Sequence, residues 1–365
     1  MNIDHQTTSS TRTEIVYIIN SLHPGGAEIG MRRLLSGLDP EKYNVTVLAL
    51  DDHSVDFTDR IPSWVRIVDL RLRSGIGVSA LRELCSSVRT ADVIVGSLYH
   101  SSMIARLCRV IRPTATIATW QHANLFESDI RRFTYRWTAS ISDTILADSG
   151  SVAEMLVSDL GLSRDCIHTV PIAGIDLDEY TLKTHREADQ ITVGTVGRLT
   201  EQKNHKAILD IAERLLGSNI QFEIAGDGEL YEEIQAEIEE RRLTNVTLHG
   251  FVDDAPAFLK SLDIYLQPSH WEGLCITVLE AMAVGLPVVG SDVGGIERNV
   301  EQGTSGYLYS SNDVDGFVSA IKTLAEDPER RHRFGERGRE IVKDGFTRKI
   351  LVDEFEAAIG TGQEQ

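Results

Sequence analysis

The chain has 365 residues, of which 42% are hydrophobic, and it carries a formal net charge of −19. This length indicates two domains, because one hydrophobic core serves at most roughly 250–300 residues. The net negative charge argues against a nucleic-acid partner, and no apolar run reaches the roughly 18 residues that a membrane-spanning helix needs.

The charge is distributed unevenly along the chain. Residues 1–175 hold 17 basic and 19 acidic side chains, whereas residues 176–365 hold 19 and 36. The first half contains one group of arginines at near-helical spacing and a second group behind it: Arg106, Arg109, Arg112, Arg131, Arg132 and Arg136. This balance fits a cytoplasmic protein whose first half contacts an anionic membrane surface peripherally, but ordinary solvated helix faces explain it equally well.

The N-terminus and the cysteines agree with a reducing compartment. Residues 1–13 are polar and lack the apolar core of a signal peptide, so we expect them to be disordered. The four cysteines, at 85, 108, 166 and 275, contain no C-x-x-C pair, which fits a cytosolic protein without structural zinc.

Apolar runs alternate with amphipathic ones along the chain. In the first half the predicted strands are 14–20, 44–50, 65–70, 92–97, 116–121 and 144–149. In the second half they are 191–197, 221–226, 246–250, 263–269, 287–291 and 306–309. Helical patterns such as 231–242 lie between these nearly continuous apolar strands. The alternation is typical of parallel sheets covered by helices on both faces, so we predict an α/β fold with two doubly wound domains.

The domain boundaries follow from the polar stretches. Residues 173–190 carry no strand or long helix pattern, so we place a linker there. The first domain is then 14–172 and the second is 191–345, followed by a helix and tail over 346–365.

A glycine pair follows the first predicted strand. Gly25 and Gly26 in SLHPGGAE precede a helix, whose backbone amides would point at a ligand. The spacing is not G-x-G-x-x-G, so the dinucleotide fingerprint is absent, and a tight turn is the plain structural explanation. A second candidate in the first domain is WQHAN, where His122 and, more weakly, Asn124 follow a strand. A lone His is more often a core or surface residue than a catalytic one.

Two cations follow the first strand of the second domain. Arg198 and Lys203 in VGRLTEQKNH could converge on a diphosphate, because Arg offers a planar fork and Lys a mobile point charge. The alternative is two ordinary surface bases. Further on, HGFVDD is a strand-to-helix turn in which Asp253 or Asp254 is expected to cap the next helix.

The most informative stretch is Ser269 to Glu297, SHWEGLCITVLEAMAVGLPVVGSDVGGIE. Glu272 is expected in the loop after a buried strand, and Glu280 about one turn into a helix. Both would then face the crevice at the carboxyl edge of a parallel sheet, where open α/β folds bind ligands. Two unrelated surface glutamates are the alternative interpretation.

This string, E-x7-E with EAMA-x-G-x-P-V-V and a following glycine pair, resembles the retaining group 1 glycosyltransferases of the family 4 type. The resemblance covers about Ile15 to Ile359, and its specific motifs lie mainly in the second half. It implies the GT-B fold, in which two Rossmann-like domains face each other across a cleft and a C-terminal helix crosses back to the first domain.

The resemblance also implies roles for the matching residues. Arg198 and Lys203 would hold the donor diphosphate, Glu272 the hydroxyls of the donor sugar and Glu280 those of the ribose. The remaining donor contacts would come from the glycine pair, from His122 beside the transferring sugar, from the backbone near the nucleobase and from the amides after Glu272: Gly25, Gly26, His122, Val252, Gly273, Leu274 and Cys275. The sequence departs from the commoner pattern at Cys275, Ile276 and Thr277, which leaves the choice of donor sugar open.

The implied reaction moves a sugar from a nucleotide diphosphate sugar, with UDP favoured, to a hydroxyl of a glycan or lipid-linked oligosaccharide. It would retain the anomeric configuration and serve the assembly of surface polysaccharide or glycoprotein glycan. Catalysis would rest on electrostatic stabilisation of the leaving diphosphate and on orientation. No Asp-x-Asp run stands at a strand end, so we expect neither a catalytic metal nor another cofactor.

Three other functions fit parts of the pattern. A glycosidase needs two acids that flank one bond, and it would leave Arg198 and Lys203 without a purpose. A non-hydrolysing nucleotide-sugar epimerase shares the fold but needs an acid and a base at the sugar ring, and we can name neither. A nucleotide-sugar-binding scaffold subunit would keep the motifs without the transfer activity.

Overall fold

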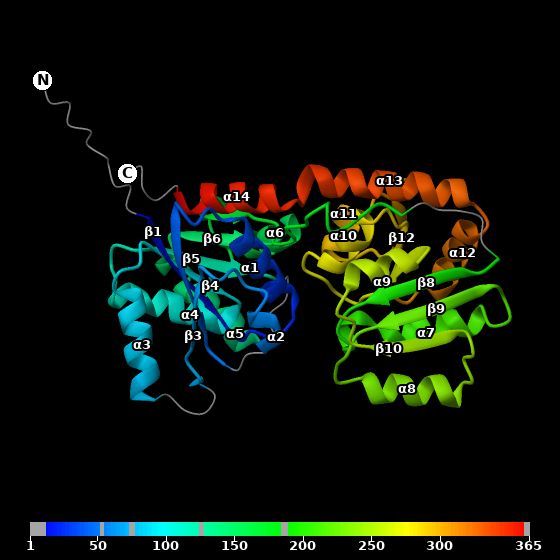
Figure 1. Ribbon diagram of the computed structural model, residues 1–365, viewed down its shortest axis with the longest axis horizontal. Helices are drawn as coiled ribbons and strands as arrows, with labels where there is room; N and C mark the ends of the chain where they lie inside the picture. Colours follow the sequence, from blue (N-terminus) through cyan, green and yellow to red (C-terminus); the bar gives the residue numbers. More distant parts are fainter. Residues whose placement is uncertain (1–11, 52–54, 73–76, 124–127, 184–188, 361–365) are drawn as a thin grey trace, which may run out of the picture. The chain divides into compact units, whose positions relative to one another are not determined.

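The structure is a computed structural model that describes residues 12–51, 55–72, 77–123, 128–183 and 189–360. The described chain forms two compact units (Figure 1). The first unit ends at Ile172 and takes up the chain again at Leu351, and the second unit is Ala173–Ile350.

Each unit is built on one parallel sheet. The described strands of the first unit are β1 (Thr13–Ile19), β2 (Tyr43–Ala49), β3 (Arg66–Asp69), β4 (Val93–Ser97), β5 (Thr116–Gln121), β6 (Thr144–Ala147) and β7 (Ile167–Thr169). Those of the second unit are β8 (Ile191–Val196), β9 (Ile220–Ala225), β10 (Val246–Gly250), β11 (Ile264–Gln267), β12 (Val288–Ser291) and β13 (Gly306–Tyr309). The spatial orders are β3-β2-β1-β4-β5-β6-β7 and β10-β9-β8-β11-β12-β13.

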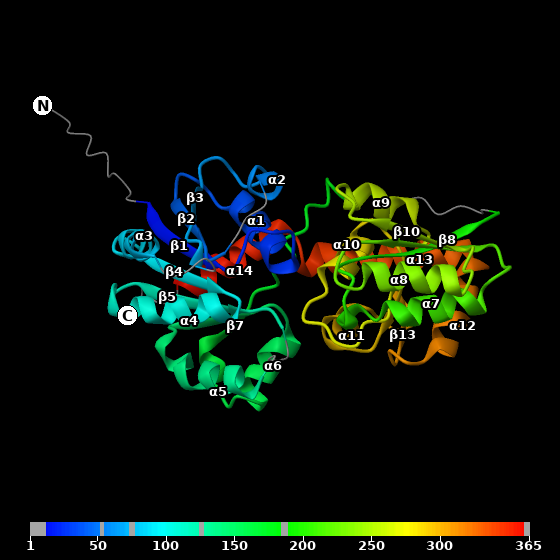
Figure 2. The same ribbon diagram turned by 90° about the horizontal axis from the view of Figure 1, so that it is seen from below.

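Helices cover both faces of each sheet (Figures 1 and 2). The first unit holds α1 (Gly26–Gly37), α2 (Val55–Thr58), α3 (Val78–Val88), α4 (Tyr99–Leu107), α5 (Asp129–Thr138) and α6 (Gly150–Ser158). The second holds α7 (His205–Arg214), α8 (Tyr231–Glu240), α9 (Ala255–Ser261), α10 (Ile276–Ala283), α11 (Gly294–Asn299), α12 (Val314–Ala325) and α13 (Pro328–Gly345). The last helix is α14 (Arg348–Gly360).

The apolar strand residues explain this layering. In the first sheet, alternate residues such as Val16 and Ile18 of β1 are buried with Ala105 of α4 in one cluster. In the second sheet, Phe222 of β9 is buried in one cluster with Phe317 of α12. Because consecutive strand residues point to opposite faces, strands buried on both faces must be nearly continuously apolar.

The predicted α/β fold with two doubly wound domains is confirmed. All twelve predicted strands are present within a few residues of their expected bounds. The sequence analysis missed β7, because three residues, Ile167–Thr169, carry too little pattern to be read as a strand. Asp254 is the predicted helix cap, since its side chain accepts a hydrogen bond of 2.9 Å from the amide of Ala257.

The terminal helix also lies where it was expected. From Leu351 onward, α14 belongs to the first unit. Its Phe355 stacks on Trp120 of β5, with ring centroids 5.9 Å apart. Both side chains are fully buried, so this contact ties the end of the chain into the core of the first unit.

Arg106, Arg109 and Arg112, at the end of α4 and just after it, do not form the basic surface that their spacing suggested. Arg106 is 2% exposed and donates to the carbonyl of Tyr135. Arg109 pairs with Asp143, and Arg112 donates to the carbonyl of Ala91. These side chains therefore hold the fold together, and a helical spacing of arginines alone could not distinguish that role from a surface role. Within the described ranges, no helix is both long enough and apolar enough to cross a membrane.

Candidate active site

The strand order reverses direction once in each sheet. In the second unit β8 is flanked by β9 and β11, so the loops after β8 and β11 leave the sheet on opposite faces. A crevice forms at such a switch point, at the carboxyl ends of the strands. The loop after β8 carries Arg198 and Lys203, and the loop after β11 carries Glu272.

Lys203 and Glu272 meet at this point. The Nζ atom of Lys203 lies 2.8 Å from Oε1 of Glu272, and both side chains are largely buried. Lys203 ends a short 3₁₀ turn, Glu201–Lys203. The next residue, Asn204, has a left-handed φ of 53° and donates to the carbonyls of Pro268 and Ser311. These bonds fix the loop that carries Lys203 to its neighbours.

The carboxylate of Glu272 has further donors. Ser269 Oγ donates to Oε1 over 2.8 Å, and Gln202 Nε2 donates to Oε2 over 3.2 Å. Ser269 in turn accepts from Gln267, whose side chain accepts from the Tyr265 hydroxyl. The chain of hydrogen bonds therefore runs from β11 to the end of the Glu272 side chain and fixes its orientation.

The electrostatics of the pair follow from its burial. Burial alone would lower the pKa of Lys203, but the nearby Cys275, Glu272 and Tyr265 outweigh it and raise that pKa. Burial raises the pKa of the Cys275 thiol to about 12, so this thiol is neutral near pH 7. The raised pKa keeps the Lys203 ammonium protonated at neutral pH.

A glycine pair supports the loop after Glu272 from behind. Gly294 has a left-handed φ of 52°, and a Cβ there would lie 2.0 Å from the carbonyl oxygen of Glu272. The amide of Gly295 donates to the carbonyl of Gly273 over 2.7 Å. No larger residue fits at either position without moving the segment that holds Gly273 and Leu274.

Cys275 occupies an unusual backbone position. It precedes α10 with a φ of 57°, in the left-handed region that favours glycine. Its Sγ lies 3.9 Å from the Nζ of Lys203 and 3.8 Å from the hydroxyl of Thr277. Cys275, the first of the three residues that depart from the common pattern, therefore lies directly beside Lys203.

The other predicted donor-site residues of the second unit include Arg198, in the loop after β8, Val252 and Glu280. Arg198 is exposed, and its guanidinium has no hydrogen-bond or ion-pair partner within the described residues. Val252 is half-buried in the loop after β10. Glu280 lies in the second turn of α10, 5% exposed, and accepts a hydrogen bond of 2.9 Å from the Tyr180 hydroxyl.

In the first unit, the predicted glycines begin α1. Gly25 is its N-cap, with an extended backbone, and Gly26 is its first residue. The side chain of Glu28, in the first helical turn, is buried. Asn124 lies outside the described residues.

His122 lies in a hydrogen-bonded row at the carboxyl ends of three neighbouring strands. Its Nδ1 is 2.9 Å from both carboxylate oxygens of Asp148, and its Nε2 is 2.7 Å from Ser97 Oγ. Burial raises the pKa of Asp148, and the neighbouring His122 opposes that shift. The order resembles a Ser-His-Asp hydrolase triad, but Ser97 is 0% exposed and cannot reach a substrate. Ser97 and Asp148 instead fix the orientation of the His122 ring.

Sequence reasoning missed several of these partners. Asp148 ends the strand next to that of His122, so its position at a strand end was a usable signal. Tyr180 stands in the segment expected to be a linker, 100 residues from Glu280, and no local pattern links the two. Among the described residues there is no group of three or more His, Cys, Asp or Glu that could hold a metal ion.

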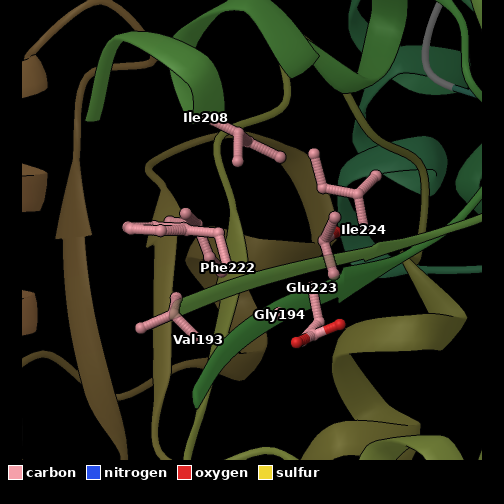
Figure 3. Close-up of a pocket in the computed structure, with 8 residues that line it drawn as sticks. Val193, Gly194, Ile208, Phe222, Glu223 and Ile224 are labelled. Atoms are coloured by element: carbon pink, nitrogen blue, oxygen red, sulfur yellow. The ribbon is translucent and has the colours of Figure 1, made fainter. Parts of the chain in front are cut away.

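A small pocket lies inside the second sheet, separate from these residues (Figure 3). It is lined mainly by core side chains such as Val193, Ile208 and Phe222. None of the predicted donor-site residues lines it, so the pocket is a packing feature of the core.

The sequence matches two family descriptions. "Glycosyltransferase Family 4" matches residues 24–179, and "Glycosyl transferases group 1" matches residues 178–341. The chain is 25% identical over 259 residues to the UDP-Gal:alpha-D-GlcNAc-diphosphoundecaprenol alpha-1,3-galactosyltransferase of Escherichia coli, covering 65% of this chain and 67% of that protein. It is 24% identical over 363 residues to the putative glycosyltransferase EpsF of Bacillus subtilis (strain 168), covering 92% of each.

A solved structure has the same architecture. Anabaena HepE, crystallised with UDP and glucose, superposes with a TM-score of 0.84 at 17% identity, over 96% of this chain and 100% of that one. At this identity the likeness shows the GT-B fold alone. Together with the two matched regions, which follow each other over almost the whole chain, it identifies the protein as a member of the group 1, family 4 glycosyltransferases, an enzyme that transfers a sugar from a nucleotide sugar.

Proposed function

We propose that this enzyme transfers a sugar from a UDP-sugar to a hydroxyl of a lipid-linked oligosaccharide or growing glycan, with retention of the anomeric configuration. The observation that carries the proposal is the buried Lys203–Glu272 pair at the switch point of the second sheet, with Ser269 and Gln202 holding the carboxylate. The E. coli relative is named for a UDP-galactose donor and a diphosphoundecaprenol-linked acceptor, which supports these two choices.

The charges of the site suit a diphosphate. Glu272 already balances the charge of Lys203, so the uncompensated cation is the exposed Arg198. Arg198 would bind the diphosphate by charge-assisted hydrogen bonds, and Lys203 would add a second cation once its ammonium turns toward the phosphate. Glu272 would then accept hydrogen bonds from the sugar hydroxyls, and Glu280 from those of the ribose. The amides of Gly273 to Cys275 would support the sugar and phosphate.

The first unit supplies the acceptor side in this proposal. His122, held by Asp148 and Ser97, would contact the transferring sugar, and Gly25 and Gly26 would approach the donor phosphate or the acceptor. The acceptor oxygen would bond to the anomeric carbon as the bond from that carbon to the diphosphate oxygen breaks. The departing phosphate would take the acceptor proton on the same face. Catalysis is then electrostatic and positional, without a metal or cofactor.

The biological setting proposed here is the assembly of surface polysaccharide or glycoprotein glycan on the cytoplasmic face of a membrane. A lipid-linked acceptor requires the enzyme to work at that surface. The near-balanced charge of residues 1–175 is compatible with a peripheral contact through the first unit.

Product analysis tests the proposal. The full chain is incubated with radiolabelled UDP-galactose, UDP-glucose or UDP-N-acetylglucosamine, with a polyprenyl-diphosphate-linked sugar as the acceptor and with EDTA present. We expect one donor to label the lipid, with an α linkage by NMR, and Lys203→Ala to abolish labelling. Isomerisation of the sugar without an acceptor would identify an epimerase instead. UDP binding without labelling by any donor would favour the scaffold subunit.

A further inference from the structure

Helix α5 lies at the outer side of the first unit, beyond α4 as seen in Figure 2. Its inner face buries Tyr135 in the core and makes several polar contacts. The Tyr99 hydroxyl of α4 is 2.6 Å from the hydroxyl of Thr134, and Arg106 donates to the Tyr135 carbonyl and to the Thr138 hydroxyl. The guanidinium of Arg106 also lies over the ring of Tyr135. The helix is therefore already anchored without Ile130, Phe133 and Trp137.

Those apolar residues point outward instead. Ile130 is 75% exposed, Phe133 59% and Trp137 70%. At 100° per residue they occupy about 60° of the helix surface, so they form one continuous stripe. The rings of Phe133 and Trp137 are in contact, with centroids 5.6 Å apart. An exposed stripe of this kind is the reverse of what a helix on a globular core needs, and it marks an interaction surface.

One flank of this stripe is basic. Arg136 is exposed beside it, and Arg132, further round the same side of the helix, is exposed and donates to the Asp159 carbonyl over 3.0 Å. Asp129 is the sole acidic residue of the helix. The neighbouring α4 and the turn after it add two more exposed apolar residues, Leu107 and Val110. A helix with aromatic residues on one side and arginines on the other is typical of segments that lie in the interface of an anionic bilayer.

We propose that the outer face of α5, defined by Ile130, Phe133, Trp137, Arg132 and Arg136, docks onto anionic phospholipid at a membrane surface. Phe133 and Trp137 insert between the headgroups, and the arginines contact lipid phosphates. This inference deepens the proposed function. It rests on that function only for the assumption that the acceptor is carried in a membrane.

Charge complementarity favours an anionic bilayer on this face. The protein has a net charge of −19, but α5 itself holds three arginines and one acidic residue, so its local charge is positive. A two-fold dimer through α5 would place these like charges against each other. Helix α3 provides an internal contrast. It also exposes two apolar residues three positions apart, Val78 at 78% and Leu81 at 53%, but its Arg82 is followed by Glu83, so it lacks the basic flank.

Vesicle binding of the full chain tests the proposal. Co-sedimentation is measured with vesicles of equal parts phosphatidylglycerol and phosphatidylcholine, and with phosphatidylcholine alone. We expect binding to the anionic vesicles, weakened by high salt, with quenching of Trp137 fluorescence by brominated lipid. Arg132→Gln with Arg136→Gln should weaken partition about thirtyfold, which corresponds to about 1 kcal/mol per charge. Phe133→Ser with Trp137→Ser should weaken it more than tenfold.

The matched control is Val78→Ser with Leu81→Ser, which removes a similar exposed apolar pair and should leave partition unchanged. The melting-temperature increase with UDP is recorded for every variant, so a defective donor site is recognised separately from lost lipid binding. Equal binding of the wild type and of the Phe133→Ser, Trp137→Ser variant would overturn the proposal. So would a wild type that ignores anionic vesicles, or a dimer in solution that the α5 variant converts to a monomer.

Discussion

The ammonium of Lys203 lies 2.8 Å from the carboxylate of Glu272, 69 residues further along the chain. The contact joins the loops after β8 and β11, which are adjacent strands on either side of the switch point. Both partners are largely buried, so removing either one leaves the other buried without its ion-pair partner.

Removing one partner of this pair should destabilise the protein. We expect Lys203→Ala to lower the free energy of unfolding by roughly 3 kcal/mol, because it leaves Glu272 buried without a counter-charge. Lys203→Ala combined with Glu272→Gln should recover much of that loss but no transfer activity. Urea unfolding and donor turnover measure the two effects. A single variant as stable as the wild type would contradict the buried-pair interpretation.

The glycine behind the Glu272 loop gives a second test. Gly294→Ala should disrupt donor binding, because its Cβ would lie 2.0 Å from the Glu272 carbonyl oxygen. Gly303→Ala is the matched control, since Gly303 also has a positive φ, 74°, but has nothing within 4 Å of its Cβ. Both variants lose roughly 1 kcal/mol for the backbone conformation. Only Gly294→Ala should also lose UDP affinity in a calorimetric titration, and equal affinities would show that Gly294 does not support the site.

The carboxylate of Asp148, which orients the His122 ring, should affect turnover rather than UDP binding. Asp148→Asn replaces the acceptor at Nδ1 by an amide that can also donate, so the ring no longer has one favoured tautomer. We expect kcat to fall by about tenfold or more while UDP affinity stays within about twofold. Ser97→Ala, which leaves Asp148 in place, should cost less. An unchanged kcat in Asp148→Asn would remove His122 from the mechanism.

The buried His205 should make the folded protein less stable in acid. Burial, assisted by the charge of Lys203, lowers the pKa of His205 from 6.5 to about 4. Between pH 6.5 and about 4, His205 is therefore protonated in the unfolded chain but neutral in the folded chain. The free energy of unfolding falls as the pH falls through that window. The loss is at most about 3 kcal/mol. Urea unfolding at pH 7 and near pH 4.5 should show that the free energy of unfolding falls less in His205→Gln than in the wild type. Equal losses would contradict the role of His205 in acid sensitivity.

The sequence predicted what local patterns encode. Twelve strands, the Asp254 cap, the loop position of Glu272 and the helix position of Glu280 all follow from residue periodicity and strand ends. The contacts Tyr180–Glu280 and Asp148–His122 join residues far apart in sequence, which a single sequence does not pair. The surface role expected of Arg106 was wrong for a related reason: this side chain finds its acceptors on a different helix and strand, so its burial depends on the tertiary fold.

The central claim is that the second unit binds a uridine diphosphate donor through Arg198 and Lys203 without metal. A thermal-shift titration of the full chain with UDP, GDP and ADP in EDTA tests it most directly, because a ligand that binds the folded state raises the melting temperature by mass action. We predict that UDP stabilises the wild type most strongly and that Arg198→Ala loses most of this effect while melting at the wild-type temperature without ligand. No stabilisation by any of the three nucleotides, or equal stabilisation of wild type and Arg198→Ala by UDP, would contradict the account.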